Sequence, residues 1–67
     1  MKSNELKAAR VAAGFTQAQA GELIGCSANT YNLKENAKSE FTIDEVVALC
    51  EAFAIHDEAR KASIFLS

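Results

Sequence analysis

The sequence predicts an all-α fold of five short helices, and three observations support this prediction. The chain has 67 residues, no proline and 49% apolar residues, a composition typical of a compact helical bundle. Residues 16–35 have the pattern of two short helices joined by a tight turn. The spacing of a capping box, in which two side chains satisfy backbone N–H groups at a helix start, occurs at Thr16 with Gln19 and at Thr42 with Glu45.

The first helix is expected to start after a cap at Ser3 or Asn4 and to run to about Ala13. Gly14 then ends it. Phe15 is expected either to staple the next helix or to fill the gap between helices.

The second and third helices are expected at residues 17–24 and 28–35. Gly25 can adopt the left-handed conformation that ends a helix, and Ser27 can cap the helix that follows. Glycine inside a helix costs about 0.5–1 kcal/mol relative to alanine, so Gly21 indicates a place where the two helices pack closely.

The fourth helix is expected to begin after Thr42 and to cover the core with one apolar stripe at helical spacing, made by Ile43, Val46, Val47, Cys50 and Phe53. The last helix is expected from about Asp57, which can cap its start, to Phe65. The apolar ending, residues 64–66, should pack back on the first helix or join a partner subunit.

Size and composition bound the function. A domain of residues 1–67 buries only about 60% of its unfolded surface, so its core is marginal and it has no room for an elaborate catalytic cavity. No long apolar run or signal-peptide core is present, and we expect a cytoplasmic protein without a membrane span.

Nothing in the residue pattern indicates an enzyme. Cys26 and Cys50 lack the spacing of a metal site and are expected to be small hydrophobes. His56 is the lone histidine, and no nucleophile or Gly-rich phosphate loop accompanies it. We therefore expect no catalytic residue, no metal, no cofactor and no small-molecule substrate.

The net charge of −2 is unevenly distributed. Residues 1–38 carry five basic and three acidic side chains, whereas residues 39–67 carry two basic and six acidic ones. The half that contains the two predicted short helices is therefore positive. A molecule with this distribution should bind DNA nonspecifically only with modest affinity.

Several positions match one family: Leu6, Arg10, Gly14, Phe15, Thr16, Gln17, Gly25, Ser27, Glu35, Asn36 and Lys38. On these residues the chain resembles the Xre/Cro-type helix-turn-helix family of phage repressors, over about residues 4–56. The resemblance implies a five-helix, lambda-repressor-like DNA-binding domain whose second and third helices form the helix-turn-helix. It also implies that the partner is a double-stranded DNA operator, bound by a homodimer.

Base contacts are expected from the helix at residues 28–35. An α-helix fits the major groove of B-DNA, where asparagine can donate to and accept from one adenine. The candidate base-reading residues are Ala28, Asn29, Thr30, Asn32 and Leu33. From this segment alone, a solvated helix without a DNA role is an equal alternative.

Phosphate contacts are implied by the resemblance at the start of the second helix and in the loop after the third. The candidates are Gln17, Ser27, Lys34, Asn36 and Lys38. Lys34 stands where many members have a buried aliphatic residue, so its charge must extend to solvent or reach a phosphate. Asn36 tolerates the left-handed conformation at a helix end, and Ala37 and Ala54 stand where glycine is usual.

Arg10 lies on the apolar side of the first helix. It could be an exposed arginine near a helix end. The resemblance instead implies a partly buried ion pair with Glu35, which costs about 3–5 kcal/mol to break from one side. Tyr31 is expected to supply core area with its hydroxyl at the surface.

These expectations favour a sequence-specific DNA-binding transcriptional regulator, of phage or prophage origin, that acts by occluding its operator. The apolar candidates for a dimer interface are the fourth helix and the C-terminus. The alternative is a protein–protein interaction (adaptor) module on the same helical fold, which the acidic second half and the apolar ending would suit.

Overall fold

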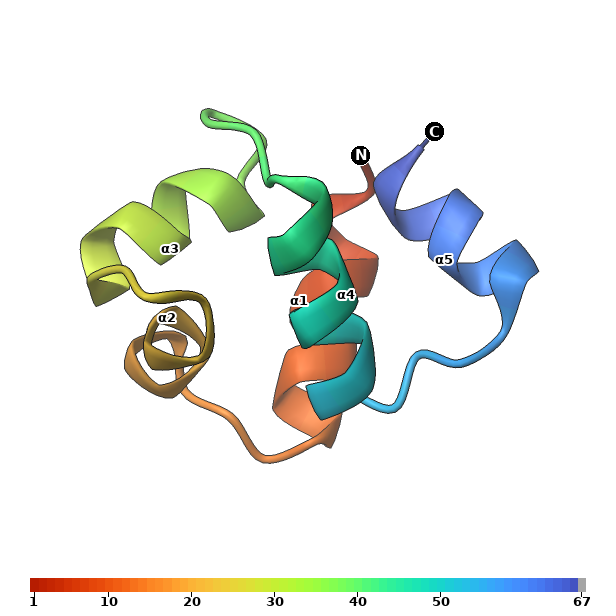
Figure 1. Cartoon of the computed structure of the whole chain (residues 1–67), viewed down its shortest axis with the longest axis horizontal. Helices are drawn as coiled ribbons and strands as arrows, with labels where there is room; N and C mark the ends of the chain where they lie inside the picture. The colour runs from red at the N-terminus through yellow and green to blue at the C-terminus, as the bar shows by residue number, and fades with distance from the viewer. Residues whose placement is uncertain (67) are drawn as a thin grey trace.

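The computed structural model describes residues 1–66, which fold into five helices with no strand. The helices are α1 (Ser3–Ala12), α2 (Gln17–Ile24), α3 (Ala28–Glu35), α4 (Ile43–Ala52) and α5 (Glu58–Phe65). Figure 1 shows α2 and α3 together on one side, α5 on the other, and α1 and α4 between them. The all-α five-helix prediction is confirmed. No helix in this range has the length and apolar character needed to cross a membrane.

Two helices begin with the predicted capping boxes. At α2, Gln19 N donates to Thr16 Oγ1 over 3.1 Å, and Thr16 N donates to Gln19 Oε1 over 3.0 Å. At α4, Glu45 N donates to Thr42 Oγ1 over 3.2 Å, and Thr42 N donates to Glu45 Oε1 over 2.9 Å. Asp57 caps α5 through its carboxylate, also as predicted. With the predicted Ser27 cap of α3, four helix starts are therefore determined by local sequence.

The start of α1 differs from the prediction of a cap at Ser3 or Asn4. Ser3 is already helical, and Lys2 occupies the cap position without a side-chain cap. Instead, Lys2 N donates to Ile64 O over 2.8 Å. The beginning of α1 is thus held by the end of α5, and Figure 1 shows the start of α1 beside the end of α5.

Close packing at the turn between α2 and α3 explains Gly21. A Cβ on this residue would lie 2.7 Å from Cys26 O and 3.0 Å from Ser27 O, and real Cβ atoms are essentially never as close as the first of these. Gly25 ends α2 in the left-handed conformation, with φ 76°. Both glycines have the roles predicted, except that Gly21 meets the backbone of the turn rather than a side chain of α3.

The left-handed residue after α3 is Ala37 rather than Asn36. Asn36 has φ −91°, whereas Ala37 has φ 60°, and Ala54 after α4 has φ 56°. Asn36, which could tolerate the left-handed conformation, therefore does not adopt it. Each alanine holds a conformation in which its Cβ crowds the following carbonyl, at a cost of roughly 1–2 kcal/mol.

The core lies between α1, α4 and the α2–α3 pair. Its buried apolar members are Leu6, Ala9, Ala20, Tyr31, Leu49, Cys50, Phe53, Ile55 and Ile64. Phe15 fills the gap between helices, because its ring centre lies 5.4 Å from that of Phe53. The Tyr31 hydroxyl is buried rather than at the surface, which corrects the prediction. It has no hydrogen bond of full geometry within the described residues.

Helix α4 turns a different face to the core than predicted. Leu49, Cys50 and Phe53 are buried, but Ile43 is 82% exposed and Val47 is 52% exposed. The stripe prediction is wrong for these two residues, because they lie at one edge of the stripe and the buried face of α4 is centred toward the other edge, at Leu49 and Phe53. Their side chains are therefore left on the surface.

The exposed residues of α4 border a surface groove of about 550 Å³, here called the α4–α5 groove. Its apolar lining includes Phe41, Ile43, Val46, Val47, Phe65 and Leu66. Leu66 is 83% exposed whereas Ile64 is buried. The apolar ending thus packs partly on the core, while Phe65 and Leu66 line the groove.

Candidate functional site

Helix α3 lies at the outside of the molecule, with one side against α2 (Figure 1). Asn29 and Leu33 are exposed, and Asn32 is half-buried on the same side of the helix. We call these three residues the amide face of α3. Among the other predicted base-reading residues, Ala28 is exposed and Thr30 is half-buried. The amide face could therefore meet a partner without a change in the helix.

Ser27 and Thr30 together form the start of α3. Thr30 N donates to Ser27 Oγ over 3.1 Å, and the Ser27 hydroxyl in turn donates to Thr30 Oγ1 over 3.1 Å. Both hydroxyls are thus engaged in the cap. Their role in this structure is to hold the first turn of α3.

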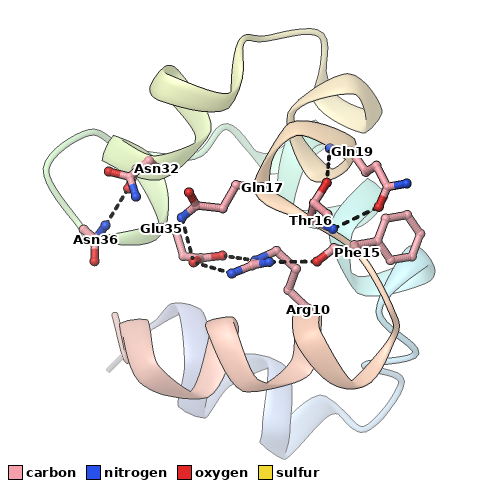
Figure 2. Close-up of polar contacts among 8 residues, drawn as sticks. All are labelled: Arg10, Phe15, Thr16, Gln17, Gln19, Asn32, Glu35 and Asn36. Carbon is pink, nitrogen blue, oxygen red and sulfur yellow. Dashed lines mark hydrogen bonds and ion pairs between the residues drawn. The ribbon is translucent and has the colours of Figure 1, made fainter.

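The end of α3 has a similar local bond. Asn36 Nδ2 donates to the main-chain oxygen of Asn32 over 2.9 Å (Figure 2). The Asn36 amide therefore covers a carbonyl at the helix end. The bond orders the side chain that was predicted to meet a phosphate.

A buried ion pair connects α1 to the end of α3. Arg10 Nε donates to Glu35 Oε2 over 2.8 Å, and Arg10 Nη2 donates to Glu35 Oε1 over 3.3 Å. Arg10 Nη1 also donates to Phe15 O over 2.7 Å. Arg10 is 6% and Glu35 2% exposed, so the expected pair is present and the alternative of an exposed arginine is wrong.

Gln17 turns its side chain toward this pair. Figure 2 shows the carboxamide directed at Glu35, with Gln17 Nε2 donating to Glu35 Oε1 over 3.4 Å. Burial, and next the Glu35 carboxylate, raise the pKa of the nearby Tyr31 phenol. The first residue of α2 and the last residue of α3 thus share one buried polar cluster.

Lys34 forms a second ion pair, with α4. Lys34 Nζ donates to Glu45 Oε1 over 2.7 Å and to Oε2 over 2.9 Å, and the two side chains are 13% and 17% exposed. The ammonium also lies 6.0 Å from the centre of the Phe41 ring. The hydrogen bond from the lysine lowers the pKa of the Glu45 carboxyl. The hydrogen bond that Thr42 N donates to the same carboxyl lowers this pKa further.

Sequence reasoning missed the role of Glu45. The capping box at Thr42 predicted where Glu45 stands on α4, but its distance from Lys34 depends on the path of residues 37–41. Lys38 is exposed in that segment, and its amide donates to Leu33 O over 2.9 Å. Of the two lysines, Lys38 is therefore the one whose charge faces solvent.

The chemistry available at α3 is hydrogen bonding and charge. Within residues 1–66, no group of three His, Cys, Asp or Glu side chains could hold a metal ion. Cys26 and Cys50 are free thiols, and burial raises the pKa of the Cys50 thiol. The exposed amides of α3 and the exposed Lys38 can each donate hydrogen bonds to a polar partner.

Comparison with known proteins supplies one finding. A family model described as a helix-turn-helix domain matches residues 3–62. Neither the curated proteins nor the solved structures contain a match. The matched residues include α1 to α4 and the first part of α5.

Proposed function

Since this chain belongs to the helix-turn-helix domain family, we propose that it is a transcriptional regulator that binds an operator sequence in double-stranded DNA. The family match covers nearly the whole chain and agrees with the resemblance to the Xre/Cro type. The function follows from α3, which would enter the major groove with its amide face toward the bases.

The observation that carries this proposal is the exposed amide face itself. Asn29 and Asn32 lie one turn apart on a helix whose opposite side is packed against the protein. An asparagine amide can form paired hydrogen bonds with adenine, and Leu33 or Ala28 could touch a thymine methyl group. The face is thus suited to distinguish base pairs rather than only to approach DNA.

Contacts with the phosphates are proposed at both ends of this unit. At the start of α2, the main-chain N–H of Gln17 can donate to an anion, because the first N–H groups of a helix have no partner in the helix. After α3, Asn36 and the exposed Lys38 can reach the DNA backbone. We omit Lys34 and Ser27 from this set, because their polar atoms are bound within the protein.

We propose that two copies bind DNA as a homodimer. Two half-sites on one face of B-DNA place the two recognition helices roughly 34 Å apart. The longest dimension of the molecule's Cα trace is 29 Å, so side chains of two copies at this spacing can meet along that dimension. The α4–α5 groove is the surface that we assign to this contact, because residues 37–41 place it directly after α3 and three of its side chains are highly exposed and apolar.

The proposed mode of action is occlusion of the operator by a protein of the cytoplasm. The phage or prophage origin rests on the resemblance to phage repressors. We propose no catalytic activity, cofactor or small-molecule effector.

Binding to DNA can be tested by selecting duplexes from a random pool, then comparing the selected duplex with a scrambled one at two salt concentrations. Asn29→Ala and Asn32→Ala should each cost about 1–3 kcal/mol on the selected duplex and little on the scrambled one. Lys38→Ala should weaken both duplexes alike and lower the salt slope by about one, because one phosphate contact is lost.

Equal losses on both duplexes for the two asparagine variants would mean that α3 does not read bases. The second candidate function, an adaptor, would then be the better one. The apolar α4–α5 groove and the acidic surplus of residues 39–67 favour it. Weak DNA binding that does not depend on salt would favour it as well.

A further inference from the structure

Two neighbouring residues of α3 form ion pairs that point in different directions. Lys34 pairs with Glu45 of α4, and Glu35 pairs with Arg10 of α1. Successive residues of an α-helix are about 100° apart around its axis. The last turn of α3 is therefore bound to two different helices, in directions about 100° apart around its axis.

The amide face lies roughly opposite these two pairs. On the same helical count, its three residues fall within about 100° of one another, on the side away from Lys34 and Glu35. Helix α3 has only eight residues, so a rotation at its last turn moves the whole amide face. The orientation of that face therefore depends on what holds Lys34 and Glu35.

The Lys34–Glu45 pair is built into the joint between α3 and α4. The Glu45 carboxylate receives both the Lys34 ammonium and Thr42 N, so one group closes the capping box and binds α3. The lysine ammonium lies 6.0 Å from the centre of the Phe41 ring, which in turn lies 6.1 Å from the Tyr31 ring of the core. This places the pair against packed side chains rather than in open solvent.

We propose that Lys34 and Glu45 are positioning residues, whose ion pair sets the rotation of α3 and thereby the angle at which its amide face meets the bases. The proposal rests on the proposed DNA-binding function. It assigns Lys34 to specificity and not to phosphate binding. Because a phosphate contact would require the lysine to leave Glu45, the two roles exclude one another.

The test uses the selected and scrambled duplexes with Lys34→Met, which keeps an unbranched stem, and Glu45→Gln, which keeps a side chain able to close the capping box as Gln19 does in α2. Lys34→Arg, which retains the pair, is the conservative control. Lys38→Ala is the control for a lost phosphate contact. Circular dichroism and thermal melts establish the temperature at which every variant is folded.

We expect Lys34→Met and Glu45→Gln each to weaken the selected duplex about threefold to thirtyfold, with the scrambled duplex and the salt slope unchanged. Lys34→Arg should retain most of the affinity of the unaltered protein for the selected duplex. Residual dipolar couplings of the free protein should show α3 rotated relative to α4 in the first two variants, a readout that needs no DNA.

Three results would overturn the positioning role. Lys34→Met could lower the salt slope by about one and weaken both duplexes alike, as Lys38→Ala should, which would make Lys34 a phosphate contact. Both variants could discriminate the duplexes as the unaltered protein does. The couplings could show α3 unmoved. Failure of the unaltered protein to discriminate the duplexes would instead overturn the proposed function, and the positioning role with it.

Discussion

Two alanines hold a backbone conformation that glycine adopts without a steric penalty. Ala37→Gly and Ala54→Gly should each raise the free energy of unfolding by about 0.5–1 kcal/mol, because relief of the left-handed penalty exceeds the extra entropy of glycine in the unfolded chain. The melting temperature should rise by about 2–8 °C for each. Thermal melts followed by circular dichroism would measure the change.

The matched controls are the reverse substitutions at Gly14 and Gly25. Both have positive φ, and a Cβ on either would meet no atom within 4 Å. Gly14→Ala and Gly25→Ala should therefore lose stability through the backbone alone. If Ala54→Gly destabilised the protein, the idea that strain is stored at this residue would be wrong.

At the scale of single residues, capping patterns predicted where helices begin better than residue preferences predicted where they end. The caps at Thr16, Thr42 and Asp57 require only neighbours in sequence, and all three were predicted correctly. The left-handed residue after α3 was not. Asparagine tolerates that conformation better than alanine, yet Asn36 is the residue that ends α3, with φ −91° and its side chain bound to Asn32 O, and Ala37 makes the left-handed turn.

At the scale of helices, the Arg10–Glu35 pair joins α1 to α3. Arg10→Met should lower the free energy of unfolding by about 3–5 kcal/mol, because it leaves the Glu35 carboxylate buried without its partner. Arg10→Met combined with Glu35→Leu should be more stable than Arg10→Met alone, since no uncompensated charge is left. Urea unfolding of the two variants and of the unaltered protein makes the comparison.

A chain this small has little stability to lose, so Arg10→Met could unfold altogether at room temperature. Rescue by the second substitution is then the informative result. An Arg10→Met variant as stable as the unaltered protein would show that the pair contributes nothing to folding.

The Lys34–Glu45 pair makes stability depend on pH. The pKa of Glu45 is below its ordinary value of 4.5 in the folded protein, first because of the Lys34 ammonium. The contribution of the pair is therefore complete above about pH 4.5 and is lost as the pH falls through the folded-state pKa. Urea unfolding between about pH 3 and 7 should show a smaller loss on acidification for Glu45→Gln than for the unaltered protein.

Parallel pH curves for the two proteins would contradict this prediction. Asp44→Asn, one position away and exposed, is the control for a carboxylate that the structure leaves in solvent. It should leave the acid part of the curve unchanged.

The existence of the helices could be predicted from the sequence, but their rotation could not. Apolar residues on α4 cover more than one face, and only the packing of α4 against the rest of the fold decides that Leu49 is buried while Ile43 and Val47 are not. The same holds at the candidate site. The residues of the amide face could be predicted from the sequence of residues 28–35, whereas the partner of Lys34 depends on how α4 returns past the end of α3.

At the scale of the whole molecule, the α4–α5 groove should determine the dimer. Val47→Glu and Ile43→Glu place a charge in the groove and should remove the two-copy complex on a full duplex, with affinity reduced about 100-fold through lost avidity. Affinity for a single half-site should not change. Sedimentation of the protein with each duplex would report the number of bound copies.

Val11→Glu is the control for a charge placed on an equally exposed apolar residue elsewhere, because Val11 of α1 is 59% exposed and lies outside the groove. It should bind as the unaltered protein does. A single copy bound tightly to the full duplex by the unaltered protein would refute the dimer.

The bond from Lys2 N to Ile64 O closes the described chain into a ring of contacts. An amide held in this way exchanges its hydrogen with solvent only when the two ends of the fold separate. Fraying of either α1 or α5 at that point breaks this bond. The hydrogen-exchange rate of the Lys2 amide can be compared with that of the Leu49 amide in the core. Equal rates would mean that the five helices unfold together, and a faster rate at Lys2 would mean that α1 and α5 separate first.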